Sequence, residues 1–151
     1  MPAFSSINDI LNFAIGEEEA AVKFYTTLAE NMERQNMKKV FQDFALEEVG
    51  HKSKLLAIKE GKLLVPSERK AIDLKVGDYL VEVEPTKNMD YQDALIIAMK
   101  KEKAAFKLYN DLATTTNNAD LKSIFLMLAQ EEAKHKVRFE IEYDDLVNQE
   151  N

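Results

Sequence analysis

Two short segments of the chain carry a glutamate and a histidine in the same arrangement. One contains Glu48 and His51 and the other contains Glu132 and His135, and in each the two residues are three positions apart. On a helix, residues three apart lie on one face, so this carboxylate and imidazole can bind the same metal ion. Both histidines of the chain belong to these Glu-x-x-His motifs. The pair is therefore a much stronger signal of a metal site than either motif alone.

An internal repeat relates the two motifs. With an offset of 84 residues and no gap, 17 of the 47 positions in 9–55 are identical to those in 93–139. Six of the shared positions recur at spacings of three and four residues, as in the buried seam of a bundle helix. They are Leu11/Leu95, Ala14/Ala98, Glu18/Glu102, Ala21/Ala105, Tyr25/Tyr109 and Leu28/Leu112. The seam of each half thus contains one glutamate among apolar and aromatic residues.

The seam glutamates complete a set of six candidate metal ligands. A buried glutamate is unfavourable unless its charge is compensated, and surface glutamates on charged helices are a poor explanation for six residues in register. One glutamate from each of two helices and a Glu-x-x-His pair from each of two others is the ligand pattern of di-iron and di-manganese carboxylate bundles. The candidates are Glu18, Glu48, His51, Glu102, Glu132 and His135. By position, Glu18 and His51 would bind one ion, and their repeat equivalents Glu102 and His135 would bind the other. Glu48 and Glu132 would bridge the two ions.

The ligand types suit two iron ions, two manganese ions or a mixed pair, because both metals accept carboxylate and imidazole ligands. Two divalent ions would balance the charge of four carboxylates. Zinc fits less well, since structural zinc sites are compact and four-coordinate. Without metal, the clustered carboxylates would repel one another, and some would take up protons.

Two further pairs of repeated residues could support the ligands. Glu47 and Glu131 each lie four residues before a histidine, where each could accept a ring N–H or could instead face solvent. Tyr25 and Tyr109 lie two turns beyond the seam glutamates, and a buried tyrosine hydroxyl needs a hydrogen-bond partner. That partner could be a ligand carboxylate on a facing helix or a backbone group.

Composition narrows the class of protein. With 151 residues, 46% hydrophobic and 31% charged, the chain is typical of a single soluble helical domain. A net charge of −7 without a basic stripe argues against a nucleic-acid partner. We find no signal peptide and no apolar run near the roughly 20 residues of a membrane span, so we expect a cytoplasmic protein. The absence of cysteine excludes disulfides, thiolate zinc sites and rubredoxin-type iron centres.

The periodicity predicts an all-α four-helix bundle over residues 1–151. Two helical hairpins, 6–60 and 90–147, would be joined by a long crossover, 61–89, which is the ferritin-like topology. We expect helices over 7–33, 37–60, about 90–115 and 119–147, with a frayed tail from 148. The crossover contains apolar residues and should pack on the side of the bundle, although a strand hairpin around Gly77 and Asp78 is an alternative.

Polar residues and one glycine mark the expected helix ends. Ser6 is a candidate N-cap of the first helix and Asn36 of the second. Gly61 is placed to end the second helix. Asn88 or Asp90 would cap the third.

The chain resembles the rubrerythrin branch of the ferritin-like superfamily. The resemblance covers both halves and rests on the six candidate ligands. Residues 78–81 and 89–95 are also similar to stand-alone rubrerythrin-like proteins. The resemblance implies a pair of iron ions that reacts with hydrogen peroxide or dioxygen during oxidative stress. It also implies an external electron-donor protein such as rubredoxin, and we expect a homodimer.

Two departures from the family shape the expected function. Rubrerythrins carry a further glutamate at the position of Ala105, so this site resembles the six-ligand bacterioferritin type. Rubrerythrins also carry a rubredoxin domain, whereas this chain has no cysteine, so its electrons must come from another protein. The sequence therefore predicts a di-iron peroxidase with an external donor. The alternatives are a ferroxidase, an iron-storage or iron-sensing protein, and a bundle whose metal is purely structural.

Overall fold

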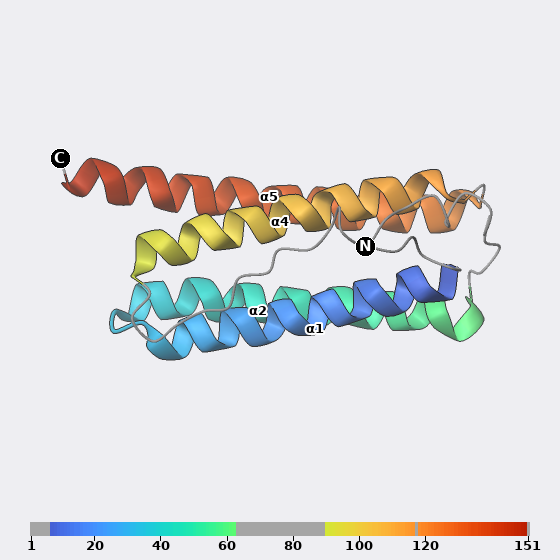
Figure 1. The fold of residues 1–151 in the computed structure, drawn as a ribbon, viewed down its shortest axis with the longest axis horizontal. Coiled ribbons are helices and arrows are strands. Elements are labelled where there is room, and N and C mark those ends of the chain that lie inside the picture. The colour runs from blue at the N-terminus through green and yellow to red at the C-terminus, as the bar shows by residue number, and fades with distance from the viewer. Residues whose placement is uncertain (1–6, 63–89, 117, 151) are drawn as a thin grey trace.

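The computed structural model describes residues 7–62, 90–116 and 118–150, and its regular elements in these ranges are all helical. The first hairpin consists of α1 (Ile7–Asn31) and α2 (Gln35–Ala57), which continues into a short π-helix, η1 (Ile58–Lys62). The second consists of α4 (Tyr91–Thr114) and α5 (Ala119–Glu150). The hairpins lie side by side, with η1 and the start of α4 at opposite ends of the bundle (Figure 1). The predicted all-α four-helix bundle is confirmed.

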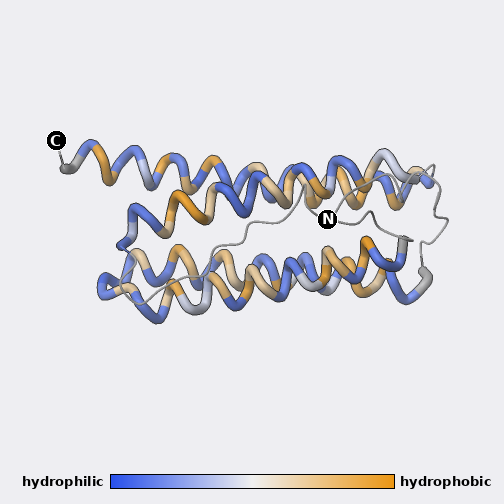
Figure 2. The backbone as a smooth tube through the Cα atoms, viewed as in Figure 1, coloured by the Kyte–Doolittle hydropathy of each residue, from blue (hydrophilic) through white to orange (hydrophobic). Residues whose placement is uncertain are grey.

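The hydrophobic core is divided into two clusters along the bundle. Hydrophobic residues gather toward the space between the helices, and hydrophilic ones lie mainly outside (Figure 2). Ile15 belongs to one buried cluster and Phe24 to the other, and Glu18 lies between them on α1. The helices pair mainly within hairpins, α1 with α2 and α4 with α5, while α1 and α4 meet only sparsely. A polar layer thus separates two apolar ends of one bundle.

The two apolar clusters differ although the sequence repeats. The ring of Tyr25 stacks on Phe41 and Phe139, with centroids 6.2 and 5.8 Å away. The repeat equivalent of Phe139 is Leu55, so the cluster around Tyr109 is more aliphatic. Both tyrosine side chains are nevertheless fully enclosed, because their relative exposures are 0 and 1%.

The start of α2 corrects one prediction. Arg34 is the N-cap, in an extended conformation with φ −82° and ψ 134°, and no side chain caps the helix. Asn36 therefore lies in the first turn and does not cap it. With no local cap to fix the boundary, the packing of Val40 and Phe41 into the core positions the start of the helix.

The end of the first hairpin also differs from expectation. Gly61 was expected just beyond the second helix, but it lies inside η1, where the chain continues as a wider turn. Ile58, at the start of η1, is 1% exposed and belongs to the core, so burial holds this turn against the bundle.

The fourth helix is longer than predicted. α5 extends to Glu150, and Figure 1 shows it passing beyond the end of the neighbouring helices. A frayed tail from residue 148 is therefore wrong. Ion pairs one turn apart support the C-terminal half, with Lys136 2.7 Å from Glu140 and Arg138 3.1 Å from Glu142.

Side-chain caps fix the start of both helices of the second hairpin. Asp90 caps α4 by accepting a hydrogen bond from the Asp93 N–H at 2.8 Å. Asn118 was not anticipated as a cap, but its side chain accepts from the Leu121 N–H at 3.0 Å at the start of α5. The predicted cap Ser6, the alternative cap Asn88 and the crossover from residue 63 lie outside the described residues. Within the described ranges, no helix has the length and apolar character needed to cross a bilayer.

Candidate metal centre

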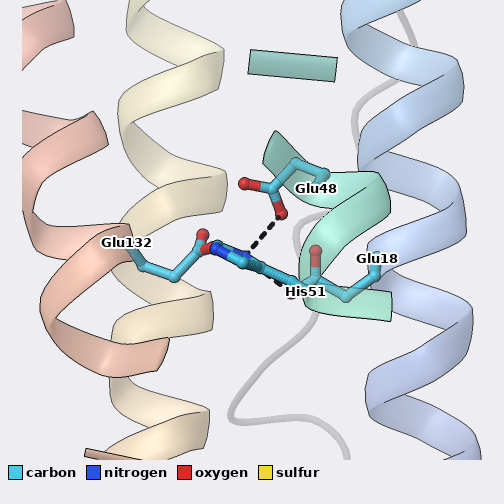
Figure 3. Close-up of side chains that lie close together, drawn as sticks. All are labelled: Glu18, Glu48, His51 and Glu132. Carbon is cyan, nitrogen blue, oxygen red and sulfur yellow. Dashed lines mark ion pairs between the residues drawn. The ribbon is translucent and has the colours of Figure 1, made fainter. Parts of the chain in front are cut away.

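The polar layer consists of six side chains contributed by all four helices. Figure 3 shows Glu18 from α1, Glu48 and His51 from α2 and Glu132 from α5 reaching toward one region between the helices. Glu102 from α4 and His135 from α5 join them. All six are at most 5% exposed. These are the six residues that the sequence repeat singles out as candidate ligands.

The six residues form two overlapping groups. One potential ligand atom from each of four residues lies within 4.8 Å of the others, first in Glu18, Glu48, His51 and Glu132 and then in Glu48, Glu102, Glu132 and His135. Two glutamates therefore belong to both groups, whereas each histidine belongs to one. This sharing is the arrangement expected of two ions bridged by Glu48 and Glu132.

The cluster leaves its own inner atoms without hydrogen bonds. In the described ranges, the buried side-chain atoms that have no partner are Glu18 Oε2, Glu48 Oε1, His51 Nδ1, Glu102 Oε2, Glu132 Oε1 and His135 Nδ1. His51 Nδ1 lies 2.6 Å from Glu132 Oε1, and His135 Nδ1 lies 3.1 Å from Glu48 Oε1, without hydrogen-bond alignment. Unpartnered buried polar atoms are costly and rare in folded proteins. One such atom on each of six convergent donors fits a pair of metal ions.

The outer nitrogen of each histidine is held by a glutamate of the other hairpin. His51 Nε2 lies 2.5 Å from Glu131 Oε2, and His135 Nε2 is paired with Glu47. The spacing of four residues within one helix suggested a partner on the same helix, but the pairing crosses between α2 and α5. Placing the proton on Nε2 leaves the Nδ1 lone pair directed into the cluster, as a metal ligand requires.

The two buried tyrosines also connect the hairpins. The Tyr25 hydroxyl on α1 donates to Glu102 Oε1 on α4, and the Tyr109 hydroxyl on α4 donates to Glu18 Oε1 on α1. Of the two partners left open by the sequence, a glutamate of the cluster is thus the one found. Each seam glutamate is left with one engaged oxygen and one free oxygen, which fixes the orientation of the carboxylate.

A cavity of about 40 Å³ reaches the cluster between α1 and α4. Its lining includes four of the candidate ligands, both buried tyrosines, Ala21 and Ala105. Glu17 and Lys101, which also line it, were not among the predicted site residues. The sequence signal that could have identified them is their position, one residue before Glu18 and Glu102.

Comparison with known proteins assigns the family. A sequence model of the family described as Rubrerythrin matches residues 9–143, which include both halves of the repeat. The chain belongs to the rubrerythrin family. A search of curated proteins finds no match.

Two solved structures share the fold of this rubrerythrin-family chain. One, from Thermotoga maritima, is described as a ferritin-like diiron-carboxylate protein; it has 22% identity and a TM-score of 0.77 over 95% of this chain and 98% of its own. The other is a hypothetical protein from Pyrococcus furiosus, with 25% identity and a TM-score of 0.77 over 95% and 92% of the two chains. The predicted ferritin-like fold is confirmed, and the family and the buried cluster together fit a di-metal protein.

In the metal-free rubrerythrin-family site, the environment favours protons on several groups. Burial raises the pKa of Glu18 and of Glu132 well above 4.5, and neighbouring carboxylates add to both shifts. Burial alone would lower the pKa of the histidines. Hydrogen bonds and charges from surrounding glutamates outweigh it, raising the pKa of His51 to about 11 and of His135 to about 10.

Metal binding should therefore release protons, and its affinity should rise with pH. The histidine pKa values in the folded, metal-free protein lie above the usual 6.5, so the stability gained from these protons is complete below pH 6.5 and is lost as pH rises toward 10. Titration calorimetry of Mn²⁺ binding in buffers of different ionisation enthalpy measures the proton count. A release indistinguishable from zero at pH 7 would contradict the predicted protonation of the site.

Proposed function

We propose that the protein is a di-iron oxidoreductase that reduces hydrogen peroxide with electrons from a separate donor protein. The observation that carries the proposal is the set of six unpartnered inner atoms, one on each of four glutamates and two histidines. Two divalent ions would balance the charge of four carboxylates, which supports a pair of ions at this site. Iron is favoured because carboxylate and imidazole ligands suit it and because of the membership in the rubrerythrin family.

When bound, an iron pair would supply two electrons to the peroxide O–O bond as each ion changes from Fe²⁺ to Fe³⁺. Reduction of one peroxide to two waters consumes these two electrons and two protons. Each cycle therefore requires two electrons from outside, since the chain has no cysteine with which to hold an iron–sulfur or rubredoxin-type centre. A small electron-transfer protein such as a rubredoxin is the proposed donor.

The protein's own residues would hold the site in one geometry during this chemistry. Glu131 and Glu47 hold the outer nitrogens of the two histidines, and Tyr25 and Tyr109 hold the seam carboxylates. The apolar clusters on both sides exclude water from the layer. The cavity between α1 and α4 leaves room for a small molecule beside the carboxylates.

Ferroxidase or another iron-handling activity is the second candidate, and Ala105 is the observation that favours it. This residue packs against the core and lines the cavity with a methyl group, where rubrerythrins carry a further glutamate. Without this carboxylate the site would have six ligands and would resemble the bacterioferritin type.

Rapid mixing of the Fe²⁺ form with each oxidant distinguishes the two functions. Hydrogen peroxide should oxidise the iron pair faster than dioxygen, and turnover should require a separate reductant such as rubredoxin with its reductase. Absorbance of the ferric centre and peroxide consumption are the measurements. Faster oxidation by dioxygen with accumulation of ferric mineral would replace the peroxidase assignment with ferroxidase, and no reaction with either oxidant would indicate a structural or sensing role.

A further inference from the structure

The lining of the cavity between α1 and α4 includes a lysine, Lys101. Lys101 belongs to α4, yet its ammonium group lies 4.9 Å from the centroid of the Phe24 ring on α1. The side chain therefore spans from one helix to the other beside the cavity that it lines. A cation over an aromatic face is attracted by the ring, so the ring favours this position of the ammonium group.

The residues around Lys101 add opposite charges to the lining and leave the cavity small. Glu17 on α1 also lines the cavity, and it occupies the position equivalent to Lys101 in the repeat, so the two halves contribute opposite charges. Ala21 and Ala105 are likewise equivalent positions, and their methyl groups leave the space inside. About 40 Å³ accommodates one molecule of roughly the size of water, dioxygen or peroxide.

A second hollow lies on the α2 and α5 side of the site, where it is lined by the two histidines and the glutamates paired with their Nε2 atoms. It has a volume of about 400 Å³, lies between α2 and α5 and is lined by Gly50 and Lys54 among others. Glu131 and Glu47 close it off, because each is paired with an imidazole Nε2. The carboxylate side of the metal layer is thus reached between α1 and α4.

We propose that the cavity between α1 and α4 is the route by which a small neutral oxidant reaches the metal pair, and that Lys101 controls access to it. The inference rests on the proposed di-metal function and adds the route and its controlling residue. Lys101 covers the mouth while its ammonium group sits on Phe24, and small molecules pass when it swings away.

The test measures how fast nitric oxide, a neutral diatomic probe, binds to the Fe²⁺-loaded protein in stopped flow. Lys101→Ala should speed binding about tenfold, and Phe24→Leu, which removes the aromatic partner of the ammonium group but keeps an apolar side chain in the core, should speed it about threefold to fivefold. Leucine is the residue at the equivalent position 108 of the other half, so the core should accept it. Lys103→Ala, an exposed lysine of the same helix outside the cavity, is the matched control and should bind at the rate of the unaltered protein.

Filling the cavity should have the opposite effect. Ala105→Leu should slow nitric oxide binding at least about tenfold, because the added side chain exceeds the free space. If that variant fails to fold or to retain metal, Ala21→Leu blocks the same space from the facing helix. Unchanged rates in the filled and the Lys101→Ala variants, with slowing instead by Gly50→Leu in the other hollow, would overturn the route.

This readout is independent of the proposed reaction. Metal content is measured in every variant before mixing, and nitric oxide binding needs neither peroxide nor a donor protein. The expected pattern of rates in a protein that fails to reduce peroxide would support the route and reject only the peroxidase assignment. If the protein reduces peroxide but the cavity variants all bind nitric oxide at the same rate, only the proposed route would be rejected.

Discussion

Replacing Glu132 with alanine should reduce the metal content from two ions per chain to one or none. Glu132 belongs to both groups of convergent donors, so its loss removes a ligand from each ion. It is 1% exposed on α5, and the neighbouring Glu131 is already paired with His51. Metal analysis of protein loaded with Fe²⁺ or Mn²⁺ and freed of excess metal gives the stoichiometry.

The matched control is Asp145→Ala, which removes an exposed carboxylate from the same helix. It should retain two ions. Glu18→Ala provides a graded comparison, because Glu18 belongs to one group only and its loss should weaken one ion more than the other. If the Glu132 variant kept two tightly bound ions, the assignment of Glu132 as a bridging ligand would be wrong.

Removing the metal should lower the thermal midpoint by about 5–10 °C. A ligand that binds only the folded chain at a hundredfold excess over its Kd adds about 2.7 kcal/mol to the free energy of unfolding, and each kcal/mol shifts the midpoint of a chain of this size by roughly 2–4 °C. The metal-free protein must also keep four buried carboxylates together, which repel one another unless protonated. Thermal melts in chelator and in Fe²⁺ or Mn²⁺ measure the difference.

The effect of metal on the thermal midpoint should also depend on pH. The gap between metal-free and metal-loaded midpoints should widen from pH 6.5 toward 10, because only the metal-free protein loses the stabilising histidine protons over that window. Glu132→Ala should show a smaller metal-dependent shift than the unaltered protein. Equal midpoints with and without metal in the unaltered protein would argue against a site that binds metal in the folded state.

The six donors and the helices that carry them could be predicted from the sequence because both depend on local periodicity. Glu48 and His51 share a helix face through their spacing alone, and Glu18 is identified as an inward residue by its equivalence to Glu102. The third and fourth helices begin near the expected residues because polar side chains such as Asp90 cap locally. Short-range rules of this kind hold whatever the rest of the chain does.

The contacts between hairpins were decided only by the tertiary structure. The glutamate that holds each histidine comes from the opposite hairpin, and the choice depends on how far α2 and α5 are rotated and separated. The same holds for Lys101, which flanks a candidate ligand in the sequence but reaches the Phe24 ring only because the tertiary structure places that part of α4 beside α1.

The helix ends that lack a capping side chain were also decided by the tertiary structure. α2 starts after Arg34 without a capping side chain, and η1 continues through Gly61 because Ile58 is buried in the core. In each case the energy that chooses the conformation comes from packing between residues distant in sequence. Spacing along the chain therefore determined which residues form the site, and the packing of two hairpins determined how those residues are held and from which side they can be reached.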